Sequence, residues 1–178
     1  DDNEVDMKLK SMVLSLPSFQ TLCEELDEID PLAAHTVRRH AIQDVADYLY
    51  ADVLEMYKVL NKECRHGKFK FDHQNPTKNA AARALKNTCL SYLIETRDVK
   101  KASIGKELAL DQFLYNLKDS QSNMTDLYAA YQVCLDSGRV SPANEGQVNC
   151  AADLARKTAI TKFEDKCHHE DLVMTKWF

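Results

Sequence analysis

Glycine and proline are scarce in this chain, because its 178 residues contain only four of each. These residues make most of the tight turns that hairpins and many-stranded sheets require, so their scarcity favours long helices. A hydrophobic content of 44% is enough for a sizeable core and argues against disorder. We therefore predict an all-α chain, in which layered antiparallel helix pairs form part of an irregular α-superhelix.

Apolar residues recur at helical spacing in the first third of the chain. Ser18 and Asp30 are placed as N-caps of two helices, and Pro31 follows the second cap at the first helical position. From Ile42 to Leu60 one apolar stripe continues without a break, which predicts a single long helix after Asp30. Residues 65–74 lack a sustained helical period and are predicted to form a connection or a poorly ordered, hairpin-like loop.

The remaining two thirds repeat the same pattern. Asn75 and Pro76 resemble another cap followed by proline, so a helix is predicted to begin there. Ser137 and Gly138 are typical of a helix end, residues 139–146 of an exposed loop, and Glu170 of the start of a last helix. Helical stripes pass through Leu85, Phe113, Tyr131, Ala159 and Phe163. With no linker and no repeat of fixed period, we predict one helical domain over residues 1–178.

Composition excludes several classes of partner. The net charge is −5, and lysine and arginine form no basic stripe, so nucleic acid is not expected as a partner. No apolar segment approaches the roughly 20 residues that span a bilayer, and no membrane association is expected. The cysteines are widely spaced without a C-x-x-C pair, which predicts reduced thiols and a cytoplasmic location; they are Cys23, Cys64, Cys89, Cys134, Cys150 and Cys167.

Metal-ligating and catalytic patterns are absent from the sequence. There is no H-E-x-x-H string, His35 and His40 diverge on a helix, and His168 and His169 are adjacent. A further set of candidate metal ligands lacks the paired spacing of structural zinc modules. It contains Cys64, His66, His73, Cys167, His168 and His169. We predict no metal ligand and no cofactor on this chain.

Nucleophile and phosphate-binding motifs are missing as well, since neither a G-x-S-x-G elbow nor a glycine-rich loop occurs. The acidic residues between Glu24 and Glu28 have no partner for proton transfer and are interpreted as a solvated face. Cys23, Cys89 and Cys134 lie on apolar faces and are interpreted as core residues. We predict no catalytic residue, and the sequence identifies no substrate-binding residue.

Both ends of the sequence suggest an excised piece of a longer protein. The first residue is Asp1 rather than Met, and the last two are Trp177 and Phe178. Such large apolar groups are expected to belong to a core helix whose partners lie elsewhere, and to leave an apolar patch that favours self-association.

Several strings, in order along the chain, resemble the C-terminal helical domain of the aminopeptidase N family of zinc metallo-aminopeptidases. The resemblance covers essentially the whole chain, which looks like the first half of that domain. The strings are Leu14-Ser15-Leu16-Pro17-Ser18, Ile29-Asp30-Pro31, Arg83-Ala84-Leu85-Lys86-Asn87-Thr88-Cys89-Leu90, Asn123-Met124-Thr125-Asp126 and Leu172-Val173-Met174-Thr175-Lys176-Trp177-Phe178.

The resemblance implies a parent enzyme that removes N-terminal residues from peptides. Its zinc would be held by H-E-x-x-H and a distant glutamate in a separate catalytic domain, so the zinc belongs to the parent and lies outside this chain. In such a parent, the helical domain walls an internal cavity and limits the access of peptides to the active site. The expected partners are therefore peptide substrates and the catalytic domain of the parent.

A free-standing helical scaffold that binds another protein in a concave groove is the alternative, and composition alone supports it equally well. The two hypotheses differ in what flanks this segment in the full open reading frame. An upstream H-E-x-x-H would establish the enzyme, whereas nearby start and stop codons would establish the scaffold.

Overall fold

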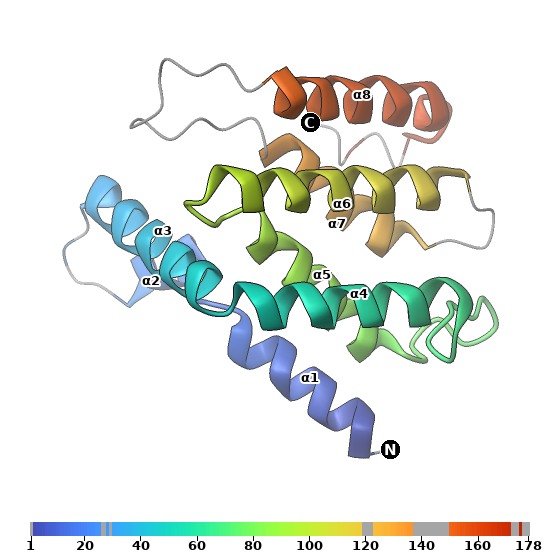
Figure 1. Cartoon of the computed structure of the whole chain (residues 1–178), viewed down its shortest axis with the longest axis horizontal. Helices are drawn as coiled ribbons and strands as arrows, with labels where there is room; N and C mark the ends of the chain where they lie inside the picture. The colour runs from blue at the N-terminus through green and yellow to red at the C-terminus, as the bar shows by residue number, and fades with distance from the viewer. Residues whose placement is uncertain are drawn as a thin grey trace. The chain divides into compact units, whose positions relative to one another are not determined.

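Figure 1 shows a chain of helices joined by connections of different lengths. The computed structural model describes residues 2–25, 28, 30–118, 123–136, 150–171 and 175, and these contain eight helices and no strand. The all-α prediction is confirmed. The helices are α1 (Asp2–Leu14), α2 (Phe19–Glu24), α3 (Pro31–Tyr48), α4 (Tyr50–His66), α5 (Ala80–Leu93), α6 (Val99–Lys118), α7 (Met124–Asp136) and α8 (Cys150–Cys167).

The chain divides into two compact units, Asp1–Ala102 and Ser103–Phe178, with the boundary inside α6. In the first unit α5 is central, because it packs against α1, α3 and α4. In the second unit α7 packs against α8. The prediction of one domain over residues 1–178 stays a prediction.

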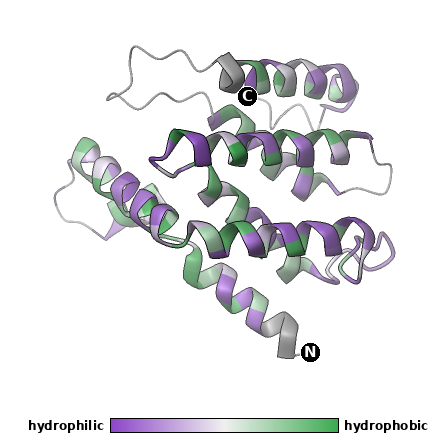
Figure 2. Cartoon of the chain, in the orientation of Figure 1, coloured by the Kyte–Doolittle hydropathy of each residue, from purple (hydrophilic) through white to green (hydrophobic). Residues whose placement is uncertain are grey.

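Helix α5 forms the core of the first unit. Its sequence is rich in small and apolar residues on more than one face, so it can be surrounded by neighbours. Leu85, Cys89, Leu90 and Leu93 are all at most 2% exposed. The helices around it are amphipathic, and Figure 2 shows hydrophobic and hydrophilic residues alternating around α3 and α4.

The predicted N-caps of α2 and α3 are confirmed. The Ser18 hydroxyl accepts a hydrogen bond from the backbone N–H of Thr21 at 3.0 Å. The Asp30 carboxylate accepts from the N–H groups of Leu32 and Ala33, both at 3.0 Å, and Pro31 occupies the first helical position. These side chains satisfy N–H groups that have no partner within the helix.

The single long helix predicted after Asp30 is wrong, because the structure has two helices, α3 and α4, that meet at Leu49. Figure 1 shows the change of direction. Leu49 has φ −97° and ψ 11°, outside the helical region, although its N–H still bonds to Val45 O. Tertiary contacts hold both sides of this joint: Asp47 binds Thr96 and Arg97, and Tyr50 donates its hydroxyl hydrogen to Lys101 O.

The predicted start of α5 at Asn75-Pro76 is also wrong, because the helix begins at Ala80. The buried guanidinium of Arg83 donates to Pro76 O and Lys78 O, both at 2.7 Å, and holds this stretch in turns. Asn79, with a positive φ of 59°, precedes the helix. The predicted connection at residues 65–74 is confirmed from Gly67 onward, since Arg65 and His66 end α4.

Aromatic rings from three helices form the core of the second unit. The Phe163 ring of α8 stacks on Tyr131 of α7 with centroids 4.5 Å apart, and Phe113 of α6 lies 5.9 Å from Tyr131. The Asn123 side chain caps α7 by accepting from the Asp126 N–H at 2.8 Å. The helical stripes predicted through Phe113, Tyr131 and Phe163 are therefore confirmed.

Some predictions fall outside the described residues. These are the helix end at Ser137-Gly138, the loop at residues 139–146 and the apolar end at Trp177-Phe178. Asp171 is helical, but most of the last helix predicted after Glu170 also lies outside them.

Candidate functional site

The histidines and cysteines considered as metal ligands are divided between the two units of the fold. Cys64 and His66 belong to the last turns of α4, and His73 lies in the connection after it, where its ring makes an edge contact with Phe71. Cys167 is buried at the end of α8, whereas His168 and His169 are exposed. Within the described ranges, no three His, Cys, Asp or Glu side chains are grouped to hold a metal ion.

The other residues singled out from the sequence have surface or core positions. His35 is exposed on α3 and makes an edge contact with the Phe19 ring, and Glu24 and Glu25 are exposed at the end of α2. Cys89 and Cys134 are buried, as predicted, while Cys23 is half-buried. None of the helices in the described part of the chain combines the length and the apolar character needed to cross a bilayer.

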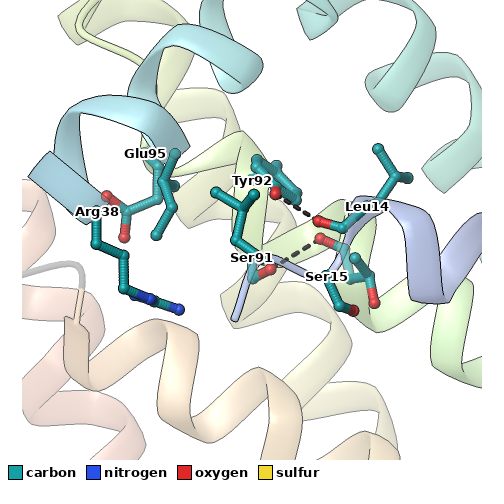
Figure 3. Close-up of a pocket in the computed structure, with 9 residues that line it drawn as sticks. Leu14, Ser15, Arg38, Ser91, Tyr92 and Glu95 are labelled. Carbon is teal, nitrogen blue, oxygen red and sulfur yellow. Dashed lines mark hydrogen bonds between the residues drawn. The ribbon is translucent and has the colours of Figure 1, made fainter. Parts of the chain in front are cut away.

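A pocket in the first unit brings together polar groups from distant parts of the sequence. Its volume is about 310 Å³, and the end of α1, the middle of α3 and the second half of α5 line it. Figure 3 shows Arg38 and Glu95 on one side, Leu14 and Ser15 on the other, and Ser91 between them. The pocket is at the lower end of the size range of small-molecule sites, which is roughly 300–1,000 Å³.

The hydroxyl groups of the pocket give their hydrogens to the backbone. Ser15 Oγ donates to Ser11 O at 2.7 Å, Ser91 Oγ to Thr88 O at 2.8 Å, and the Tyr92 hydroxyl to Leu14 O at 2.5 Å. A hydroxyl has one hydrogen, so each of these oxygens offers only lone pairs to a ligand. The hydroxyl side of the pocket is therefore a set of hydrogen-bond acceptors.

Arg38 has the opposite character, because a guanidinium can only donate. Its Nε donates to Pro17 O at 2.7 Å, which fixes the side chain at the pocket. Its two Nη atoms make no hydrogen bond or ion pair with the described residues. Burial raises the pKa of Tyr92, and the Arg38 charge opposes that rise, so the hydroxyl that bonds to Leu14 stays protonated at neutral pH.

A cluster around Arg97 positions two walls of the pocket by tying α3 to the connection that follows α5. Thr96 Oγ1 donates to Asp47 at 2.5 Å, and Arg97 bonds to Asp47 at 2.9 Å and to Asp44 at 2.8 Å. Burial raises the pKa of Asp47, but the hydrogen bonds from Thr96 and Arg97 and the guanidinium charge outweigh burial, so the pKa lies below its usual value of 3.8.

The described lining offers acceptor oxygens, a guanidinium and a carboxylate, which are groups that can bind a small polar molecule. Sequence reasoning missed the pocket, because its residues extend from Leu14 to Glu95 and form no motif. Tyr92 is buried. The one available signal was the group of hydroxyl residues, Thr88 and Ser91, on the stripe of α5.

Comparisons with known proteins give matches that extend over all or nearly all of the chain. A family model described as "Domain of unknown function (DUF3458_C) ARM repeats" matches residues 1–178. Aminopeptidase N of Haemophilus influenzae is 30% identical over 175 residues, which cover 98% of this chain and 16% of that protein. Aminopeptidase N of Escherichia coli is 28% identical over 177 residues, which cover 99% of this chain and 17% of that protein.

The chain therefore spans about one sixth of the length of these two relatives. The resemblance to the aminopeptidase N family that the sequence strings indicated is confirmed by these matches.

Proposed function

The chain belongs to the family of ARM-repeat domains described as DUF3458_C, and from this premise we propose that it is a helical, non-catalytic segment of a zinc aminopeptidase. The parent would remove N-terminal amino acids from peptides. The observation that carries the proposal is the match of 98% and 99% of this chain to two proteins named aminopeptidase N.

The role that we propose for the segment is to wall the cavity of the parent and to limit the access of peptides to its active site. Two features support it. Helices packed around α5 make a rigid body of the kind that can line a cavity. The chain also spans only about one sixth of each relative, which leaves room for a catalytic domain in the rest of such a protein.

The zinc of the parent would be bound outside this chain. The motif H-E-x-x-H does not occur in this sequence, and both of its histidines are needed on one helical face to hold the metal. We propose a cytoplasmic location, which is supported by the cysteines that form no disulfide, namely Cys23, Cys64, Cys89, Cys134 and Cys167.

The test uses the parent polypeptide, with this segment present and with it deleted. If the proposal is right, the deleted form keeps stoichiometric zinc but cleaves a panel of peptides of increasing length with changed preference. Because deletion also lowers stability, the two forms are compared at a temperature at which circular dichroism shows both to be folded. An unchanged preference over the panel would refute the role in peptide access.

The scaffold hypothesis predicts a different result at the level of the gene. Its open reading frame would begin and end close to this segment and would encode no H-E-x-x-H. Assaying the isolated chain with an amino-acid arylamide and added zinc is a simpler check of the non-catalytic role, for which we expect no turnover.

A further inference from the structure

The pocket lined by α1, α3 and α5 has a positively charged hydrogen-bond donor on one side and hydrogen-bond acceptors on the other, an arrangement that suits one kind of small molecule. Arg38 supplies a positive charge and N–H donors, while Ser15, Ser91 and Tyr92 supply oxygen lone pairs. The Glu95 carboxylate lies in the lining as well. Figure 3 shows these groups around one space.

We propose that this pocket binds a free α-amino acid in its zwitterionic form. The carboxylate of the ligand pairs with the Nη atoms of Arg38, and the ammonium group donates its hydrogens to the hydroxyl oxygens and to Glu95. A guanidinium binds a carboxylate through two parallel hydrogen bonds, which fixes the orientation of the ligand.

The apolar residues of the lining provide a surface on which the side chain of the ligand can pack. Leu16 and Ile42 are both half-buried and line the pocket beside the polar groups. Burial of an aliphatic side chain against them is favourable by about 25 cal/mol per Å² of apolar surface. An aliphatic amino acid such as leucine therefore matches the charged groups and the apolar residues together.

Other ligand classes fit these groups less well. A phosphate or a dicarboxylate would bring a second negative charge near the Glu95 carboxylate, and like charges repel. A simple amine would offer no acceptor to the two Nη atoms of Arg38, and a simple carboxylate would offer no donor to the hydroxyl oxygens. The volume of about 310 Å³ limits the ligand to a small molecule.

This inference goes beyond the proposed function, since it concerns a ligand site on the chain itself. It is tested on the full 178-residue chain by isothermal titration calorimetry with three probes. The probes are L-leucine, 4-methylpentanoate, which lacks the amino group, and 3-methylbutylamine, which lacks the carboxylate. We expect leucine to bind with a millimolar or lower Kd and each of the other two at least ~10-fold more weakly.

Substitutions in the pocket test separately the residues that bind the carboxylate and the ammonium group of the ligand. Arg38→Gln should weaken leucine ~10-fold or more while leaving 3-methylbutylamine unaffected, because it removes the group that pairs with the ligand carboxylate. Ser91→Ala should weaken leucine and 3-methylbutylamine and spare 4-methylpentanoate. Arg39→Gln is the matched control, because Arg39 is the neighbour of Arg38 on α3 but does not line the pocket, and it should bind leucine as the unaltered chain does.

Two results would overturn the proposal: no heat of binding for leucine on folded chain, or equal binding of the three probes. The probe comparison uses the unaltered chain, so it decides the question even if Arg38→Gln fails to fold, which circular dichroism detects. Neither result involves peptide cleavage, so failure here and failure of the proposed aminopeptidase role are distinguishable.

Discussion

At the scale of single residues, burial sets the chemistry of two thiols. Cys89 on α5 and Cys134 on α7 are 0% and 1% exposed. Burial raises the pKa of each to about 12, because the thiolate would lose its hydration. Both residues therefore act as small hydrophobic groups, as their positions on apolar stripes predicted.

The first prediction concerns labelling of these thiols by iodoacetamide at neutral pH, read by mass spectrometry. Cys89 and Cys134 should stay unlabelled in the folded chain, because the thiolate fraction at a pKa near 12 is roughly 1 in 100,000 at pH 7. Cys23, which is half-buried, serves as the internal control and should be labelled first. Unfolding in urea should expose all of them, and early labelling of Cys89 or Cys134 would contradict the prediction.

Arg83 is a second residue whose surroundings determine its role. It is 6% exposed, donates to Pro76 O and Lys78 O, and lies over the Phe71 ring at 5.1 Å. A buried guanidinium with two backbone partners organises the turns before α5. Removing it leaves two carbonyl groups without these donors.

We expect Arg83→Met to lower the free energy of unfolding by about 2–4 kcal/mol, since two hydrogen bonds from a charged donor are lost. Urea denaturation followed by circular dichroism measures the change. Arg156→Met, at an exposed position on α8, is the control and should change stability by less than about 0.5 kcal/mol. Equal effects of the two substitutions would show that Arg83 does not hold the turns.

At the scale of helices, the joint between α3 and α4 depends on contacts with a distant segment. Asp47 at the end of α3 accepts from Thr96 Oγ1, from the Arg97 backbone N–H at 3.0 Å and from the Arg97 side chain. The hydrogen bonds that Arg97 donates to Asp44, and then to Asp47, raise its pKa, so its charge is constant at any ordinary pH. Asp47 is the member of the cluster with a lowered pKa, and it makes the joint sensitive to acid.

The direction in which the pKa of Asp47 is shifted determines how the stability of the folded chain depends on pH. Its pKa is lower in the folded chain than the usual 3.8, so its contribution to stability is complete well above pH 3.8 and is lost as the pH falls through the lower, folded-state value. Urea denaturation over a pH series should therefore show less acid sensitivity for Asp47→Asn than for the unaltered chain. The same slope for the unaltered chain and Asp47→Asn would refute the assignment.

At the scale of the whole molecule, each of the two units has its own core. The first is built around α5, and the second around the rings of Phe113, Tyr131 and Phe163. Ring pairs in these arrangements add to the energy of apolar burial. The second core also has buried polar groups, since Gln112 Nε2 donates to Asp126 O at 3.1 Å.

We predict that Phe163→Ala lowers the free energy of unfolding by about 3–5 kcal/mol, because it removes the ring from the centre of the second unit and leaves a cavity. Leu154→Ala on the same helix is the matched control, since Leu154 is 66% exposed, and it should cost less than about 0.5 kcal/mol. Thermal unfolding of both variants measures the difference. Similar losses would mean that the ring stack does not hold the unit together.

The sequence by itself determined the helical class, the caps at Ser18 and Asp30, and the apolar stripes. These features depend on neighbouring residues, because capping and helical periodicity act within one or two turns. For the same reason the resemblance carried by short strings could be recognised before any fold was known.

Only the tertiary structure decided where the chain bends and what it could bind. No proline or glycine at Leu49 marks the break between α3 and α4 in the sequence. The break depends on hydrogen bonds that Asp47 and Tyr50 make with residues some 50 positions later in the chain. The late start of α5 depends on the buried Arg83, and the pocket on residues from Leu14 to Glu95. Such contacts join groups far apart in the sequence, and their energy exists only once the helices have packed, so no local pattern reveals them.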